Sequence, residues 1–572
     1  MSSNATRRLL DRLDEAKRIF SEKGRLTLER TLRRLSRTNI DDADSLIRYH
    51  ETLLFLRAYP QSAKLLQLTD AQLVSFARRV ARLLELEVDP SVLEHPEISG
   101  IAGTGVSDAF SYRIARWLLR HQPGRVRLDA DWVDDESRLA ATLPRFLPLL
   151  KEDALVEANV PYRKWLRAGK PPRTAELEWL ISRFESLPKS DDEKAELYEA
   201  MQLYVRWLPT YRASRTGMRL PVRSMFYHRQ PPIPRREVSL AAELNRPPLP
   251  VIRLSTTAGE NILNLARETS TVRYRELYGF THGDPKRVLK FSPGRGVDLF
   301  VFGLPPEKRL PLRAYHAAMI FKNGIPVAYF EGLSLFERME SGFNLYYTFR
   351  DGETAWLYAQ TLRVYKQLLG VTAFTLDPYQ IGYENEEGIS SGAFWFYRKL
   401  GFRPMRRELL KLTLQEEKRI NSKRDYRTRP SMLGKLAAGY MIYESEPEQS
   451  REWDNFQVRT IGLAVDGCMA QRYGGDPEKM RTASLAYVTR TLGLDVSGWN
   501  PAAERALEEL SLVLALIPDL HRWSNIEKKQ LARVIRAKTS PDESAYLRAL
   551  QRHQRLRKEL IKLGSRGSEF NL

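Results

Sequence analysis

The stretch that most constrains the fold runs from Phe343 to Pro404, where a strand pattern, a helix pattern and a second strand pattern follow one another. Apolar residues first alternate with polar ones, as in a half-buried strand, at Phe343, Leu345, Tyr347 and Phe349. The helix then has apolar residues at three- and four-residue steps and stops at Gly370, a residue free to adopt positive φ. The second strand covers 371–376. This order predicts a βαβ unit whose first turn directs a helix N-terminus, a favourable anion site, beyond the strand.

An aromatic-rich helix, 392–400, follows the second strand and ends in Gly401-Phe402. The sequence Phe396-Tyr397-Arg398-Lys399-Leu400-Gly401-Phe402 resembles the FYxKLGF ending of the GNAT acetyltransferase superfamily. The preceding segment has the order of elements expected for that family. It includes a hairpin of 315–322 and 325–330 about Asn323-Gly324, a strong two-residue turn signal. The resemblance covers residues 250–415 and implies an acyltransferase domain.

The resemblance further implies that acetyl-CoA, or another acyl-CoA, is the cosubstrate. The strand of 345–349 would contact the pantetheine arm, and the loop of 350–355 would hold the pyrophosphate at the helix N-terminus. Ser390 stands where the family commonly has an asparagine. The implied cofactor-binding residues are Tyr347, Phe349, Arg350, Asp351, Gly352, Glu353, Thr354, Ala355 and Ser390.

Acyl transfer to an amine requires a base for the amine, donors for the oxyanion and an acid for the leaving thiolate. By resemblance, a backbone N–H of 345–349 is the oxyanion donor and Tyr397 is the acid. Candidates for the base are Glu331, Glu337 and Glu340, and we rank Glu340 first because it lies nearest the start of the cofactor strand. Each candidate also has an ordinary structural interpretation, as a core aromatic or as a solvated carboxylate at a strand end.

The loop of 350–355 departs from the family pattern Q/R-x-x-G-x-G/A, because Gly352 comes one residue early. Asp351 and Glu353 also place negative charge where two phosphates would lie. Either carboxylate could instead point away and cap the helix, where a negative charge is favourable without any ligand. Two functions therefore stay open, an active N-acyltransferase and a catalytically inactive GNAT-like scaffold or sensor.

The remainder of the chain has mainly helical periodicity. We expect helices throughout 1–215 and a proline-rich linker over 216–249, with one short helix at 240–244, because proline breaks regular elements. Helices are also expected within 430–572, at 452–470, 477–492, 501–517, 525–537 and 542–563. The sequence therefore predicts the α+β class, with a central GNAT-like mixed α/β domain at 250–415 between all-α N-terminal and C-terminal regions.

Two other features are given structural interpretations. The sequence Gly100-Ile101-Ala102-Gly103-Thr104-Gly105 resembles a dinucleotide-binding loop, but no strand pattern precedes it. We interpret it as a turn, with Ser107 or Asp108 capping a helix over 109–119. The single cysteine, Cys468, excludes an internal disulfide and a cysteine-based zinc site, and no two histidines have metal-ligand spacing.

The formal charge is +20, of which residues 1–40 and 521–572 carry +14. A basic balance favours polyanion partners, so a protein that binds nucleic acid through its basic terminal helices is a third possible function. Arg-rich helices that only solvate their outer faces are the alternative. No apolar run approaches the ~20 residues of a membrane span, and the N-terminus lacks the apolar core of a signal peptide. We therefore expect a cytoplasmic protein with no membrane partner and an amine acceptor that the sequence does not identify.

Overall fold

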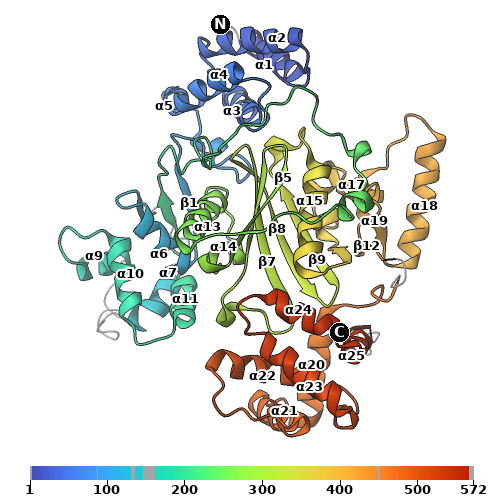
Figure 1. Ribbon diagram of the computed structural model, residues 1–572. Coiled ribbons are helices and arrows are strands. Elements are labelled where there is room, and N and C mark those ends of the chain that lie inside the picture. The colour runs from blue at the N-terminus through green and yellow to red at the C-terminus, as the bar shows by residue number, and fades with distance from the viewer. Residues whose placement is uncertain (1–2, 87, 130–135, 146–161, 447–450, 566–572) are drawn as a thin grey trace. The chain divides into compact units, whose positions relative to one another are not determined.

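The computed structural model describes residues 3–86, 88–129, 136–145, 162–446 and 451–565 (Figure 1). The class is α+β, and the chain divides into two compact units. The first comprises Met1–Pro231, Leu263–Thr281 and Asn323–Pro326, and the second comprises Pro232–Ile262, His282–Lys322 and Val327–Leu572. The division after Pro231 falls inside the proline-rich segment, which also contains α12 (Leu240–Leu244) where a short helix was predicted.

The first unit is mainly helical. Its described helices are α1 (Ser3–Ala16), α2 (Glu22–Ser36), α3 (Ala43–Ala58), α4 (Ala63–Val74), α5 (Phe76–Leu84), α6 (Tyr112–His121), α7 (Glu136–Thr142), α9 (Tyr162–Gly169), α10 (Glu176–Ser186), α11 (Asp191–Ala200) and α14 (Tyr278–Thr281). The unit also takes in most of α13 (Thr256–Thr271). It further contains a small antiparallel sheet in the order β1 (Val106–Asp108), β3 (Val205–Trp207), β2 (Val126–Leu128). The sequence did not predict this sheet, because three-residue strands are too short to show an alternating pattern.

The second unit contains a nine-stranded sheet in the order β11-β12-β10-β9-β8-β7-β6-β5-β4. The strands are β4 (Ile252–Arg253), β5 (Val288–Gly294), β6 (Val297–Phe302), β7 (Ala314–Lys322), β8 (Ile325–Leu335), β9 (Arg338–Leu345), β10 (Ala373–Leu376), β11 (Arg403–Pro404) and β12 (Met441–Glu444). The predicted hairpin is present, since β7 and β8 neighbour each other and Asn323 and Gly324 between them have φ of 50° and 79°. The β9–β10 pair is parallel.

The parallel pair is joined by α15 (Thr354–Leu369), which lies along one face of the sheet (Figure 1). Tyr358 of this helix hydrogen-bonds Ser341 of β9, and the Tyr365 ring stacks on Phe330 of β8. The helix ends at Gly370, which has the left-handed conformation expected from the sequence. The βαβ unit predicted from the sequence is therefore present.

The C-terminal part of the second unit differs from the prediction in three places. The helix expected over 452–470 begins only at Val458 and continues to Tyr473. The sheet does not end before residue 415, because α18 (Arg407–Ser422) and α19 (Pro430–Leu436) are followed by β12, which lies between β10 and β11. The long helix expected over 542–563 is two helices, α24 (Glu543–Gln551) and α25 (Gln554–Ser565). The remaining helices are α16 (Glu386–Ser390), α17 (Ala393–Arg398), α20 (Val458–Tyr473), α21 (Pro477–Leu492), α22 (Pro501–Leu514) and α23 (Asn525–Ala537). Among the described residues, no helix is long and apolar enough to cross a bilayer.

Candidate active site

The two parallel strands diverge at one end. Their register runs from Ala373 opposite Arg338 to Thr375 opposite Glu340, and β10 then ends at Leu376. In contrast, β9 continues to Leu345, and its other edge stays paired with β8 as far as that residue. The last part of β9, after Glu340, is therefore not paired with β10. It leads directly into the loop before α15.

The predicted strand of 345–349 is wrong in its boundaries. The strand ends at Leu345, and Tyr347–Phe349 form a 3-10 turn in which Phe349 N donates to Tyr346 O (2.9 Å) and Arg350 N donates to Tyr347 O (3.2 Å). The alternating apolar pattern of the sequence extends beyond the end of the strand because the turn also buries an apolar side chain. Phe349 is fully buried beneath the turn, whereas Tyr347 is half-buried. The backbone that borders the diverging strands is therefore that of β9 itself, which ends at Leu345.

Glu353, which the sequence placed among the phosphates, points into the protein interior. It is fully buried, and its Oε2 lies 2.9 Å from Lys322 Nζ of β7. Its Oε1 accepts from Nε of Arg295 (2.6 Å), a residue in the turn between β5 and β6. Burial alone would raise the pKa of Glu353, but the two cations outweigh it and hold this pKa below its ordinary value. Burial lowers the pKa of Lys322 to about 8.

The loop therefore presents less negative charge than its sequence suggests. Glu353 is the N-cap residue of α15 by position, but it makes no side-chain hydrogen bond to the helix, and the prediction that an acidic residue caps the helix does not hold for it. Arg350 and Asp351 are exposed, Gly352 and Thr354 are half-buried, and Ala355 is buried. The first backbone N–H groups of α15 follow directly, and such groups favour an anion.

Arg350 links the loop to the segment after β10. Its guanidinium forms an ion pair with Glu387 of α16, and both side chains are about half exposed. Ser390, also in α16, is exposed, and its hydroxyl donates to the Glu387 carbonyl oxygen (3.0 Å). The structure thus brings the helix of Ser390 next to the loop, while the Ser390 hydroxyl is used within that helix.

Tyr397 lies in α17, inside an aromatic cluster. Its ring contacts Tyr358 and Phe402 edge to face, with centroids 5.4 and 5.8 Å away. Burial raises the pKa of Tyr397 well above its ordinary value, so the phenol keeps its proton at neutral pH. Tyr358 hydrogen-bonds Ser341 of β9, so the cluster packs against the strand that borders the diverging pair.

The three carboxylates proposed as bases have different surroundings. Glu337 is buried against Arg557, with 3.0 Å from Nε to Oε2, and accepts from Trp453 Nε1 (2.9 Å), so its role is structural. Glu331 accepts from the Tyr315 hydroxyl, and burial raises its pKa although this hydrogen bond opposes the shift. Glu340 keeps about a quarter of its side chain exposed and lies 3.6 Å from Arg313. Only Glu331 and Glu340 are therefore accessible to chemistry.

A cavity of about 460 Å³ opens where β10 ends. Its lining includes Asp377, the first residue after β10, and Tyr440, the residue before β12. Burial raises the pKa of Tyr440 to about 12, and the nearby carboxylates of Glu340 and Asp377 contribute to the shift. Glu340 therefore lies close to the cavity wall. Sequence reasoning missed Asp377 and Tyr440, although a polar residue directly after a parallel strand is a usable signal for a site.

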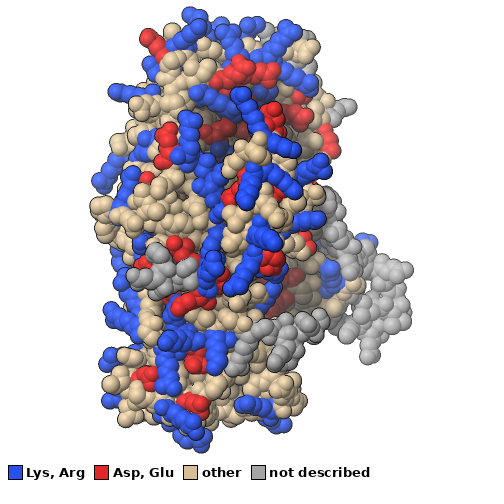
Figure 2. Space-filling model, turned by 90° about the vertical axis from the view of Figure 1, so that its right-hand side faces the viewer, with Lys and Arg blue, Asp and Glu red and all other residues tan. Residues whose placement is uncertain are grey.

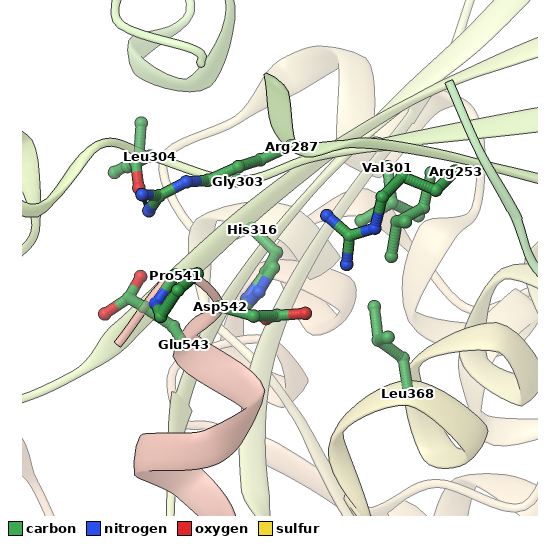
Figure 3. A pocket seen from close by; sticks show the side chains of 11 residues that line it. Arg253, Arg287, Val301, Gly303, Leu304, His316, Leu368, Pro541, Asp542 and Glu543 are labelled. Atoms are coloured by element: carbon green, nitrogen blue, oxygen red, sulfur yellow. Dashed lines mark hydrogen bonds between the residues drawn. The ribbon is translucent and has the colours of Figure 1, made fainter. Parts of the chain in front are cut away.

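A second, smaller cavity lies between β7 and the start of α24, on the α15 side of the sheet (Figure 3). It holds about 20 Å³, room for one water molecule. The imidazole of His316 faces Asp542 and Glu543 there, and its Nδ1 has no hydrogen-bond partner among the described residues. Burial lowers the pKa of His316, so the ring is neutral. A cavity of this size suits a buried water molecule rather than a substrate.

A Thr–His–Glu chain in the first unit looks like a catalytic triad but has no access. His50 Nε2 lies 2.8 Å from Thr216 Oγ1, and His50 Nδ1 lies 2.9 Å from Glu51 Oε1. All three side chains are buried, and Thr216 accepts from Ala102 N (2.8 Å). The chain therefore holds the Gly100–Gly105 turn in place, as a structural element.

The predicted cap of the next helix is wrong, because β1 ends at Asp108 and Ser111 caps α6.

Comparison with protein-family models gives no match, and comparisons with curated proteins and with solved structures give none either. Within the described ranges, no group of three or more His, Cys, Asp or Glu residues is arranged to hold a metal ion.

Proposed function

We propose that the sheet-bearing unit is an acyl-CoA-dependent N-acyltransferase, which transfers the acetyl group of acetyl-CoA, or another acyl group, to an amine. The observation that carries the proposal is the inward turn of Glu353. Its pairing with Lys322 and Arg295 removes negative charge from a loop that joins a diverging parallel pair to the N-terminus of α15. The same observation favours the enzyme over an inactive scaffold, because the charge that argued against phosphate binding is neutralised internally.

Phosphate binding is assigned to the start of α15. The backbone N–H groups of Thr354 and Ala355 would hold the pyrophosphate, aided by the positive end of the helix dipole. Arg350 would supply a cation by exchanging its surface pair with Glu387, which costs little because exposed pairs contribute only about 0–1 kcal/mol. Asp351 is exposed at the edge of this site.

The chemistry is assigned to Tyr397 and Glu340. Because the pKa of Tyr397 is raised, its phenol donates a hydrogen bond to the departing thiolate rather than losing its proton early. Glu340 is assigned as the base because it lies near the cavity. Its charge contributes to the raised pKa of Tyr440, which lines that cavity. Glu331, on β8 and on the same face of the sheet, is the competing base, with a pKa that burial brings closer to neutrality.

Calorimetry with acetyl-CoA and with free CoA tests the proposal. Gly352→Val places a bulky side chain in the loop and should abolish the binding heat while the fold survives. The matched control is Gly462→Val, since Gly462 is an exposed glycine of α20 at which an added Cβ would meet no atom within 4 Å. Absence of CoA binding by the wild-type protein, or equal affinity in the Gly352 variant, would refute the assignment.

A second candidate function, nucleic-acid binding, is favoured by one observation. Figure 2 views the side of the molecule that carries α18, and Lys and Arg side chains crowd that surface. Arg407, Lys411, Lys418, Lys423 and Arg424 are all exposed along and just after this helix. The basic termini favour this candidate less, because some of their basic residues are already paired within the protein, as in Lys17–Asp14 and Arg557–Glu337.

The test is RNA and DNA binding at low and moderate salt, since phosphate contacts make affinity fall steeply with salt. Reversing Lys411 and Lys418 to Glu should weaken binding if α18 is the surface. No binding at about 50 mM salt, where the effect is largest, would exclude this function.

A further inference from the structure

The cavity at the end of β10 has walls of opposite charge. Asp377 and Glu384 come from the segment that follows β10, whereas Arg406 immediately precedes α18 and Arg459 belongs to the first turn of α20. A ligand that carried only one kind of charge would leave half of these groups without a counterpart. The lining therefore fits a molecule with both a cationic and an anionic group.

The two arginines are available for a ligand. Within the described residues, neither Arg406 nor Arg459 forms an ion pair, whereas their neighbour Arg403 is paired with Glu444 and Asp454. Arg459 Nε donates to Gln457 Oε1 (2.5 Å), which is also in the lining, and this leaves its two terminal nitrogens for a ligand. The Arg406 side chain lies beside Gly439, where an added Cβ would be 3.4 Å from Arg406 Cδ. Arginine presents a planar set of donors that matches a carboxylate.

The cavity also has an aromatic wall. Tyr379 and Tyr383 are 59% and 41% exposed, which is unusual for such large side chains, and both line the cavity together with Tyr440. Exposed aromatic side chains around a concave site commonly contact ligands, and their rings favour an aromatic or apolar group.

From this lining we infer that the acyl acceptor is an α-amino acid or a short peptide with an aromatic or apolar side chain. The inference rests on the proposed acyltransferase function. The carboxylate is bound by Arg406 and Arg459, the side chain packs against the tyrosines, and the amine lies toward Asp377 and Glu340, beside the diverging strands. No residue of the cavity is required to bind CoA, so the two sites can be tested separately.

The reaction balances as follows. The acceptor ammonium first releases one proton to solvent. Its nitrogen then forms a bond to the acyl carbon while the carbon–sulfur bond breaks. A second amine proton passes to Glu340, and the CoA thiolate gains a proton by way of Tyr397. Both residues are restored by exchange with solvent, so the net products are the N-acyl amino acid, free CoA and one proton.

Three matched probes test the acceptor class. They are L-phenylalanine, phenethylamine, which lacks the carboxylate, and 3-phenylpropionate, which lacks the amine. Binding to the wild-type protein is measured by calorimetry without CoA, and transfer is measured as thiol release from acetyl-CoA. We expect L-phenylalanine to bind about tenfold or more tightly than either analogue, since each loses charge-assisted hydrogen bonds.

The variant Arg406→Met should weaken L-phenylalanine binding about tenfold and leave phenethylamine unchanged. Its control is Arg407→Met, an exposed neighbour that does not line the cavity. Equal binding of L-phenylalanine and phenethylamine, or no binding of either, would overturn the inference even if CoA binds. Binding of L-phenylalanine without any CoA binding would retain the amino-acid site and refute the acyltransferase.

Discussion

Replacing Lys322 with Met tests how the loop before α15 is held. The substitution keeps an unbranched side chain but leaves Glu353 buried with Arg295 as its remaining cation, and the Arg295 side chain is about a third exposed. Removing one partner of a buried ion pair typically costs about 3–5 kcal/mol, because the other charge stays buried without compensation. Since Arg295 remains, we expect the lower end, about 3 kcal/mol.

Differential scanning calorimetry measures this cost. For a unit of this size, about 3 kcal/mol lowers the midpoint of its unfolding transition by about 4–5 °C. The control is Lys290→Met, because Lys290 pairs with Asp298, both side chains are about a quarter exposed to solvent, and exposed pairs contribute about 0–1 kcal/mol. The double variant Lys322→Met with Glu353→Met removes both buried charges and should recover most of the loss.

The same variants connect stability to binding. If Glu353 is held inward by Lys322, the Lys322 variant should also lose affinity for CoA, because the carboxylate is then free to turn toward the phosphates. The reasoning is refuted if Lys322→Met unfolds at the same temperature as Lys290→Met. It is equally refuted if the double variant is less stable than the single one.

Tyr397→Phe should lower kcat by about 10²–10⁴-fold with CoA affinity unchanged, whereas wild-type turnover would make Tyr397 a core aromatic only. Glu340→Gln should lower kcat more than Glu331→Gln, and the reverse order in steady-state rates would move the base to β8. Burial raises the pKa of Glu268 from 4.5 to about 7, so the folded protein holds a proton there that the unfolded chain releases, and stability is lost as pH rises through this window. Glu268→Gln should therefore stabilise the protein by about 2–3 kcal/mol at pH above 7 and have little effect below pH 4.5, as measured by urea denaturation.

Local patterns in the sequence were enough to predict the βαβ unit and several element boundaries. The Asn323-Gly324 turn, the stop of α15 at Gly370, and the helices α12, α21 and α23 all lie where the sequence places them. These features depend on residues close together in the chain, such as two turn residues with positive φ or an N-cap residue ahead of an apolar repeat. The FYRKLGF segment likewise forms a short helix and a turn in the position expected for it.

Only the tertiary structure decided the charge of the loop and the composition of the cavity. Glu353 meets Lys322 and Arg295, which are 31 and 58 positions away, and the Glu337–Arg557 pair spans 220 positions. The return of β12 to the sheet brings Tyr440 beside Asp377 in the same way. The direction of a charged side chain depends on which opposite charge is buried with it, because the free-energy cost of removing a charge from water is offset only by a specific partner. That partner is chosen by strand order and packing, which the local sequence does not encode.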